Sequence, residues 1–417
     1  MSMLMDMSAE ELSVREAELQ TQLDALKGRG LALDMTRGKP APEQLDLAND
    51  LLSLPGPGDY KTAGGVDCRN YGGIDGIPEA KALFAEYMEV SQNEIILGGT
   101  ASLTLMHDTV ANLLLHTEWG KAPIKFLCPA PGYDRHFNIC KHFGIEMIVV
   151  PLDDDGPDMD KVESLVKADP AIKGIWCVPK YSNPTGSTYS DEVVDRLASM
   201  SAAPDFRVFW DNAYAVHTLT ESVAPLKNML TACKQGGNPN RVFMFGSTSK
   251  ISFAGMGVSM MASSEENLDW VRSHLGMQTI GPDKINQLRH VRFFKNHQGI
   301  LDHMQKHAAI LRPKFDAVDE ILTRELGGRG IATWSRPSGG YFVSLDTPDG
   351  CAKEVVALAA EAGIKLTGAG ATFPNRNDPK DRNIRIAPSL PALLDIRAAT
   401  EGLALCVELV SIRKRRR

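Results

Sequence analysis

Several familiar signals are missing from this chain of 417 residues. Its seven cysteines are scattered and form no C-x-x-C pair, which argues against a disulfide framework or a zinc site and favours reduced thiols in the cytoplasm. The N-terminus has no basic region followed by an apolar run, so we expect no secretion signal, and no apolar run reaches membrane-spanning length. The net charge of −7 disfavours nonspecific binding to nucleic acid. These absences leave a globular protein that is long enough for two or more domains.

The two ends of the chain have distinct patterns. The segment from Ala9 to Leu26 is acidic early and carries apolar residues at helical spacing, which predicts an amphipathic helix that packs on its own chain or on a partner subunit. The last five residues, Arg413 to Arg417, are all basic. We predict a solvated tail there rather than a contact with nucleic acid.

Short apolar runs alternate with helical stretches through the middle of the chain. This alternation predicts an α/β fold with a mainly parallel sheet covered by helices on both faces. The strand-like runs are residues 95–97, 124–128, 147–150, 175–178, 208–210, 242–245 and 258–261.

The last third of the chain reads differently. A long helical pattern from Val291 to Leu326 leads into turns, short strands and a final helix, which predicts a smaller α+β domain. We therefore expect an N-terminal arm that forms part of the small domain (1–50), a large domain (51–300) and a C-terminal small domain (301–417).

Polar residues follow several of the predicted strands. Asp211 follows one run, the group Ser247 to Lys250 follows another, and the loop Gly98 to Ser102 follows a third. Ligands gather at the carboxyl ends of strands in such sheets, so one shared site is expected there.

The residue types at this edge suit pyridoxal 5′-phosphate (PLP). Lys250 could carry the cofactor as a Schiff base, and Asp211 could hold the ring nitrogen protonated. Tyr214 and Asn183, which begins the turn Asn-Pro-Thr-Gly, could both bond the ring's phenolic oxygen. Taken singly, each has an ordinary explanation, such as a polar loop, a helix cap or a buried tyrosine. Their joint occurrence in this order favours the cofactor site.

A phosphate and a substrate carboxylate also find candidate partners. Small residues that open a helix let backbone N–H groups approach a phosphate, and neither a P-loop nor a G-x-G-x-x-G fingerprint is present. Tyr133 could stack on the ring, and Arg385 could bind a carboxylate with two hydrogen bonds. The phosphate candidates are Gly99, Thr100, Ala101, Ser102, Ser247 and Ser249.

These residues resemble those of fold-type I PLP enzymes, specifically the aminotransferase class I/II family, from about Asp34 to Ser389. The resemblance implies that Lys250, Asp211 and Tyr214 are catalytic and that the remaining residues named above hold cofactor and substrate. It further implies a homodimer with shared active sites, in which Tyr71 reaches the phosphate of the partner subunit. Gly38 matches the small residue beside the substrate.

One position departs from the family. An arginine usually serves the phosphate a few residues after the lysine, and here Gly257 stands in its place. Lys284 is our candidate to replace it. With the segments 35–40 and 278–284, this departure resembles a divergent bacterial branch of aspartate aminotransferases, which implies ping-pong transfer of an amino group from aspartate to 2-oxoglutarate. Arg37 and Lys39 are then candidates for the distal carboxylate.

Alternatives stay open at this point. Arg289 or Arg135 could bind the distal carboxylate instead. The substrate could be an aromatic, kynurenine-type or alanine-like amino acid, or the reaction a β-lyase reaction. The run from Ser247 to Lys250 also fits the S-x-x-K motif of penicillin-recognising serine enzymes, but the motif order is wrong. A PLP-binding domain of a transcriptional regulator would need a winged-helix domain before Asp34, for which we expect no room.

Overall fold

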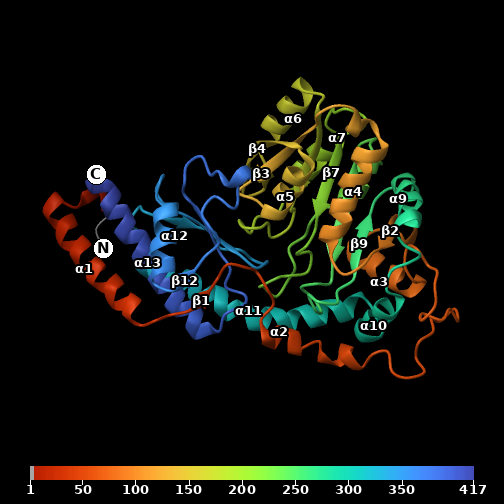
Figure 1. Ribbon diagram of the computed structural model, residues 1–417, viewed down its shortest axis with the longest axis horizontal. Coiled ribbons are helices and arrows are strands. Elements are labelled where there is room, and N and C mark those ends of the chain that lie inside the picture. The colour runs from red at the N-terminus through yellow and green to blue at the C-terminus, as the bar shows by residue number, and fades with distance from the viewer. Residues whose placement is uncertain (1–3) are drawn as a thin grey trace.

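The computed structural model describes residues 4–417 (Figure 1). Its α-helices are α1 (Ala9–Gly28), α2 (Pro42–Asp46), α3 (Pro78–Met88), α4 (Ser102–His116), α5 (Asp134–Phe143), α6 (Met159–Ala168), α7 (Asp191–Ser199), α8 (Met229–Gln235), α9 (Glu265–Gln278), α10 (Lys284–Phe294), α11 (His297–Leu326), α12 (Ala352–Glu361) and α13 (Leu393–Arg416). Its strands are β1 (Leu33–Asp34), β2 (Ile95–Leu97), β3 (Lys125–Ala130), β4 (Glu146–Asp153), β5 (Gly156–Pro157), β6 (Ile172–Cys177), β7 (Arg207–Asp211), β8 (Val242–Ser247), β9 (Ser259–Ala262), β10 (Thr333–Trp334), β11 (Val343–Asp346), β12 (Ile364–Lys365) and β13 (Asn383–Ile386).

The largest sheet has eight strands in the order β2-β9-β8-β7-β6-β3-β4-β5. Neighbouring strands from β4 through β3, β6 and β7 to β8 are parallel, whereas β9 and β5 pair antiparallel with β8 and β4. The predicted α/β class with a mainly parallel sheet is therefore confirmed. The carboxyl ends of β6, β7 and β8 lie side by side at one edge of this sheet.

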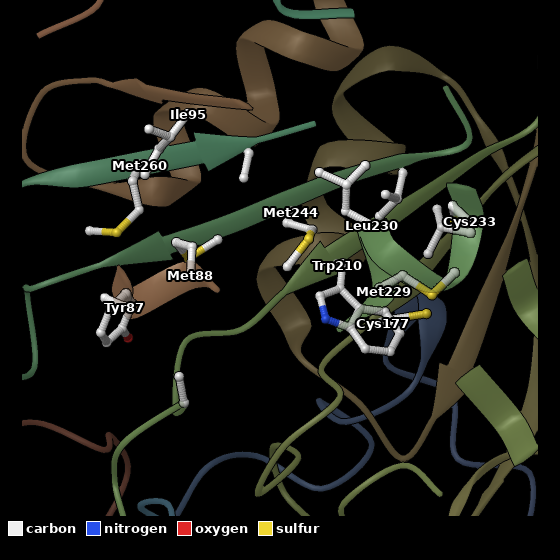
Figure 2. Close-up of a cluster of buried hydrophobic side chains, with 14 of the residues drawn as sticks. Tyr87, Met88, Ile95, Cys177, Trp210, Met229, Leu230, Cys233, Met244 and Met260 are labelled. Carbon is white, nitrogen blue, oxygen red and sulfur yellow. The ribbon is translucent and has the colours of Figure 1, made fainter. Parts of the chain in front are cut away.

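Apolar side chains cover both faces of the sheet. In β7, Val208 and Trp210 belong to one buried cluster and Phe209 belongs to another, as expected where alternate side chains point to opposite faces. Figure 2 shows part of the first cluster, including Trp210, Met244 and Tyr87. Both faces are thus largely apolar, and the packed sheet supports the residues at its edge.

The second region contains the antiparallel sheet β10-β11-β13 and the parallel pair β1-β12. It lies beside the long helices α11 and α13, with α1 at its outer side (Figure 1). The predicted N-terminal helix is confirmed as α1, whose Leu19 and Leu23 are buried in the core of its own chain.

Helix α11 joins the two regions. Ile300 and Met304 in its first turns pack in a cluster of the large sheet, whereas Leu311 and Leu322 pack in the core of the second region. The predicted boundary after residue 300 falls at the start of this helix, and the division of the chain stays a prediction.

Two details differ from the sequence-based expectations. The pattern from residue 291 to 326 is not one helix, because the chain turns at Lys295 (φ 66°) and the Asn296 side chain caps the new helix α11. The basic tail is exposed from Lys414 onward, as predicted, but it is helical and makes ion pairs. Most of it is the last turn of α13, where Arg413 and Arg416 pair with Glu16 of α1.

Within residues 4–417, no helix has the length and apolarity needed to cross a membrane. The same residues contain no cluster of histidine, cysteine and acidic side chains suited to a metal ion.

Candidate active site

A small cavity lies at the carboxyl edge of the sheet. Asp211 is the last residue of β7, and Ser247 is the last residue of β8. The structure brings seven of the sixteen predicted site residues together in this cavity, although they come from distant parts of the sequence. Its polar lining is Ser102, Tyr133, Asn183, Asp211, Tyr214, Ser247 and Lys250.

Asp211 is buried, and only one of its two carboxylate oxygens has a hydrogen-bond partner among the described residues. Its Oδ2 accepts a hydrogen bond from Nε2 of His136 at 2.9 Å, and the imidazole of His136 stacks on Trp176 at 4.4 Å. Its Oδ1 is buried without a hydrogen-bond partner among the described residues. Sequence reasoning missed His136. The available signal was its position one helical turn after Tyr133, which places both residues on the same face of α5.

The turn that carries Lys250 is held by hydrogen bonds from its neighbouring residues to His290. Its Nζ lies 4.8 Å from the centre of the Tyr214 ring and makes no hydrogen bond or ion pair with any described residue. On either side of Lys250, the hydroxyls of Thr248 and Ser252 lie 3.1 and 2.8 Å from Nε2 of His290. Burial lowers the pKa of His290 to about 4, so this imidazole is neutral and accepts from the hydroxyls. His290 was also missed, and nothing in its local sequence identifies it.

Arg385 of β13 reaches across to the large sheet. Its Nη1 donates to Oδ1 of Asn183 at 3.2 Å and pairs with Asp134 at 3.3 Å, and its Nη2 donates to Oγ1 of Thr367 at 3.2 Å. The guanidinium lies over the ring of Phe342 at 4.8 Å. Arg385 is buried, and its Nε has no partner in the described part of the chain. The positive group is therefore fixed beside Asn183.

Burial shifts the pKa of two tyrosines in the cavity. It raises the pKa of Tyr133 to about 12 and raises that of Tyr214 further above its ordinary value. Both phenols are therefore neutral at physiological pH and can donate hydrogen bonds.

Three loops meet where a phosphate would lie. The carbonyl of Gly99 accepts from the backbone N–H and the hydroxyl of Ser259, at 2.7 and 2.9 Å. The hydroxyl of Ser249 donates to the carbonyl of Thr100 at 3.0 Å. The predicted phosphate residues from two separate segments are thus in contact.

The sequence profile described as aspartate amino-transferase matches residues 7–417. The chain belongs to this family. An aspartate aminotransferase of Corynebacterium glutamicum is 48% identical over 416 residues, which cover 98% of this chain and 96% of that protein.

Solved structures agree with this assignment. The crystal structure of an aspartate transaminase from Corynebacterium glutamicum matches with a TM-score of 0.97 at 48% identity, covering 99% of both chains. An α-aminoadipate aminotransferase from Thermus thermophilus, complexed with N-(5′-phosphopyridoxyl)-L-leucine, has a TM-score of 0.76 at 21% identity over 94% of this chain and 97% of that one, and shows the fold alone. The predicted family is confirmed, and the protein is an aminotransferase of the fold-type I class, whose members generally use PLP and are generally dimeric.

The departure at Gly257 has a steric cause in this aminotransferase. A Cβ atom at Gly257 would lie 2.8 Å from the Ser249 hydroxyl and 3.0 Å from the Thr100 carbonyl. Any side chain there, an arginine included, would push the two loops apart. Lys284 does not point at these loops, because its Nζ donates to the carbonyl of Gly72 at 2.7 Å. In this structure it supports the segment that carries Tyr71.

Tyr71 is not brought into the cavity of its own chain. Its side chain is 82% exposed. Gly38, in contrast, is closely packed, because a Cβ there would lie 2.6 Å from the ring of Phe342, which itself contacts Arg385. A small residue is therefore required beside the candidate substrate site.

The candidate cations for a distal carboxylate are less well placed. Arg37 and Lys39 are exposed and form no ion pair within residues 4–417. Arg135 is exposed and lines a neighbouring surface pocket, which shares Leu103 with the candidate site. Arg289 donates to the carbonyl of Leu54. The geometry favours none of the four strongly.

Proposed function

We propose that this aminotransferase transfers the amino group of aspartate to 2-oxoglutarate, with PLP as its cofactor and in a ping-pong cycle. The observation that carries the proposal is Asp211, which is buried at the end of β7 and lines the same cavity as Lys250 with an unpartnered Oδ1. A buried carboxylate oxygen without a partner is costly. A protonated ring nitrogen would satisfy it.

The remaining residues of the cavity suit the aldehyde carbon, the ring face and the phenolic oxygen of the cofactor. Lys250 would hold it covalently, Tyr133 would stack on its ring, and Tyr214 and Asn183 would donate to its phenolic oxygen. When bound, the cofactor withdraws electrons from the α-carbon of the substrate. Its phosphate would be held by Gly99, Thr100, Ala101, Ser102, Ser247, Ser249 and Tyr71 of the partner subunit.

Different side chains of the protein would carry out proton transfer and stabilise the cofactor ring. Lys250 Nζ removes the proton from the α-carbon as general base and returns a proton as general acid. Asp211 keeps its negative charge toward the ring because His136 donates to its other oxygen at 2.9 Å. The buried walls around Asp211 and Tyr214 keep water away from these proton transfers.

The substrate would be held at both ends. Arg385 is the residue for the α-carboxylate, because its guanidinium is fixed beside Asn183 and still has an unpartnered Nε. Arg37 and Lys39 flank the packed Gly38 and are free of ion pairs among the described residues, which supports them for the distal carboxylate. The choice of aspartate rests chiefly on the relative named aspartate aminotransferase.

A kinetic panel tests the substrate. Aspartate, alanine, phenylalanine and kynurenine would each be assayed with 2-oxoglutarate, and glutamate would be assayed with oxaloacetate. A desolvated guanidinium–carboxylate pair should favour aspartate over a neutral amino acid by about 2–3 kcal/mol, roughly 30- to 150-fold in kcat/KM. Equal values for alanine or phenylalanine and for aspartate would reject the dicarboxylate assignment and favour the other aminotransferase or β-lyase reactions.

A single substitution tests the chemistry. Lys250→Ala should abolish both transamination and the visible absorption of the bound cofactor, because no other amine stands at that position. Unchanged turnover in this variant would reject the whole assignment.

A further inference from the structure

A second cavity, of about 260 Å³, opens at the same edge of the large sheet. None of the residues that line it lines the candidate active site. Alternation along β7 explains the separation. Phe209 and Asp211 point to the face of the candidate active site, whereas Trp210 points to the other face and lines the second cavity. Figure 2 shows Trp210 within the buried cluster on that face, together with Tyr87, Met88 and Met244, which also line the cavity.

Three polar groups in this cavity lack partners. The Tyr87 hydroxyl and Oδ1 of Asn212 are buried and unbonded among the described residues, and the Tyr87 side chain is only 5% exposed. Lys180 is only 6% exposed, and its Nζ makes no hydrogen bond or ion pair in that same part of the chain. Its ammonium lies 5.6 Å from the centre of the Tyr181 ring, and the carboxylate of Glu89 acts on it through space without forming an ion pair. A buried ammonium is normally paired, so the site is built for a group that the protein itself does not supply.

The other charged groups around Lys180 form no ion pair with it within residues 4–417. Lys227 also lines the cavity, but its Nζ is paired with Asp195 at 2.6 Å. Glu89 lies exposed just after α3, and His297 lies half-buried at the start of α11. Burial lowers the pKa of Lys180 to about 8, so most of this amine is still protonated at neutral pH.

The remaining lining is mostly apolar. It includes Met88, Val216, Leu226, Met244 and Leu301. A ligand that satisfies the whole cavity therefore needs one anionic group and an apolar body.

We propose that this cavity is a second binding site, which takes a small organic carboxylate with an apolar body. Lys180 and the Tyr87 hydroxyl hold the carboxylate, and Oδ1 of Asn212 accepts from a hydroxyl or amino group where the ligand has one. Since Asn212 directly follows Asp211, an occupant of this cavity contacts the residue next to the cofactor's predicted partner.

Calorimetry on the PLP-loaded enzyme tests the site, with phenylacetate as the probe. Phenylacetamide has the same body without the charge and should bind at least about tenfold more weakly, and acetate, which lacks the body, should also bind more weakly. Lys180→Met should weaken phenylacetate binding by about tenfold or more, and Tyr87→Phe by roughly threefold to tenfold. Lys227→Met is the matched control, because this lysine is already paired, and it should change the affinity by less than about twofold.

A carboxylate could also bind at Arg385, so Arg385→Met separates the two sites. Retained phenylacetate binding in that variant supports the second site. Binding that is lost there but kept in Lys180→Met overturns the proposal, as does the absence of any phenylacetate binding to the unaltered enzyme. If Lys180→Met fails to fold, Tyr87→Phe decides the question, because it removes only an unbonded hydroxyl and should fold normally.

Discussion

The inner and outer parts of the candidate active site differ in how they are held. In the inner part, Asp211 and Arg385 are buried and fixed by hydrogen bonds within the chain. In the outer part, Arg37, Lys39 and Tyr71 are exposed, and Tyr71 does not line the cavity of its own chain. The comparison indicates that one chain by itself arranges the groups for the chemical step. We expect recognition of the substrate's distal end and completion of the phosphate site to require contacts with a ligand or a second subunit.

The largest effect is expected in the inner part, from Asp211→Asn. An amide cannot hold the ring nitrogen protonated, so the rate should fall by about a hundredfold or more, equivalent to about 2.7 kcal/mol of barrier, while the cofactor stays bound. The measurement is kcat with saturating aspartate, alongside the absorption spectrum of the cofactor. A loss below about tenfold, near 1.4 kcal/mol, would refute the role of Asp211.

The inner part also shows which site residues and contacts can be predicted from the sequence and which cannot. Lys250 and Asp211 could be predicted because each follows an apolar run, and parallel strands bring their carboxyl ends together. The spacing of His136 from Tyr133 could have suggested the residue, but not its bond to Asp211, which spans 75 residues and depends on how α5 packs over the sheet. The ion pairs of the basic tail were not foreseen for the same reason, since Glu16 lies 397 residues from Arg413. Local patterns specify elements, whereas side-chain pairing between distant elements needs the packed structure.

In the outer part, the double substitution Arg37→Met with Lys39→Met should remove the preference for a dicarboxylic substrate. The ratio of kcat/KM for aspartate to that for alanine should fall by roughly 30- to 150-fold, because the distal carboxylate would lose its cation. The two single variants then show which residue acts. A double variant with an unchanged ratio would move the assignment to Arg135 or Arg289.

Tyr71 tests whether the outer part is completed by a second subunit. We propose a homodimer in which this exposed tyrosine bonds the phosphate of the neighbouring site. Tyr71→Phe should then weaken PLP binding by about tenfold, the usual upper range for one hydroxyl. Tyr60→Phe is a control on the same segment, since its ring is covered by Arg69 at 3.5 Å. Light scattering gives the oligomeric state, and a fully active monomer at micromolar concentration would contradict the proposal.

The smallest effect concerns the acid sensitivity of the inner part. His290 braces the turn of Lys250, and burial lowers its pKa from 6.5 to about 4. Between these values the unfolded chain binds a proton that the folded chain does not, so the free energy of unfolding rises with pH in this window and falls as the solution is acidified. One such histidine contributes about 1 kcal/mol of this loss between pH 6.5 and 5.5.

The variant that isolates this contribution is His290→Gln, which keeps an acceptor toward Thr248 and Ser252 but does not titrate. Burial also lowers the pKa of His217 and His307, each to about 3, so acid sensitivity is reduced in the variant and not abolished. Urea unfolding at pH 6.5 and 5.5, at one fixed protein concentration, should show a pH-dependent loss that is smaller by about 1 kcal/mol than in the unaltered protein. The same loss in both proteins would mean that His290 is not the buried neutral brace of the Lys250 turn. The rigidity of the inner part would then have another source.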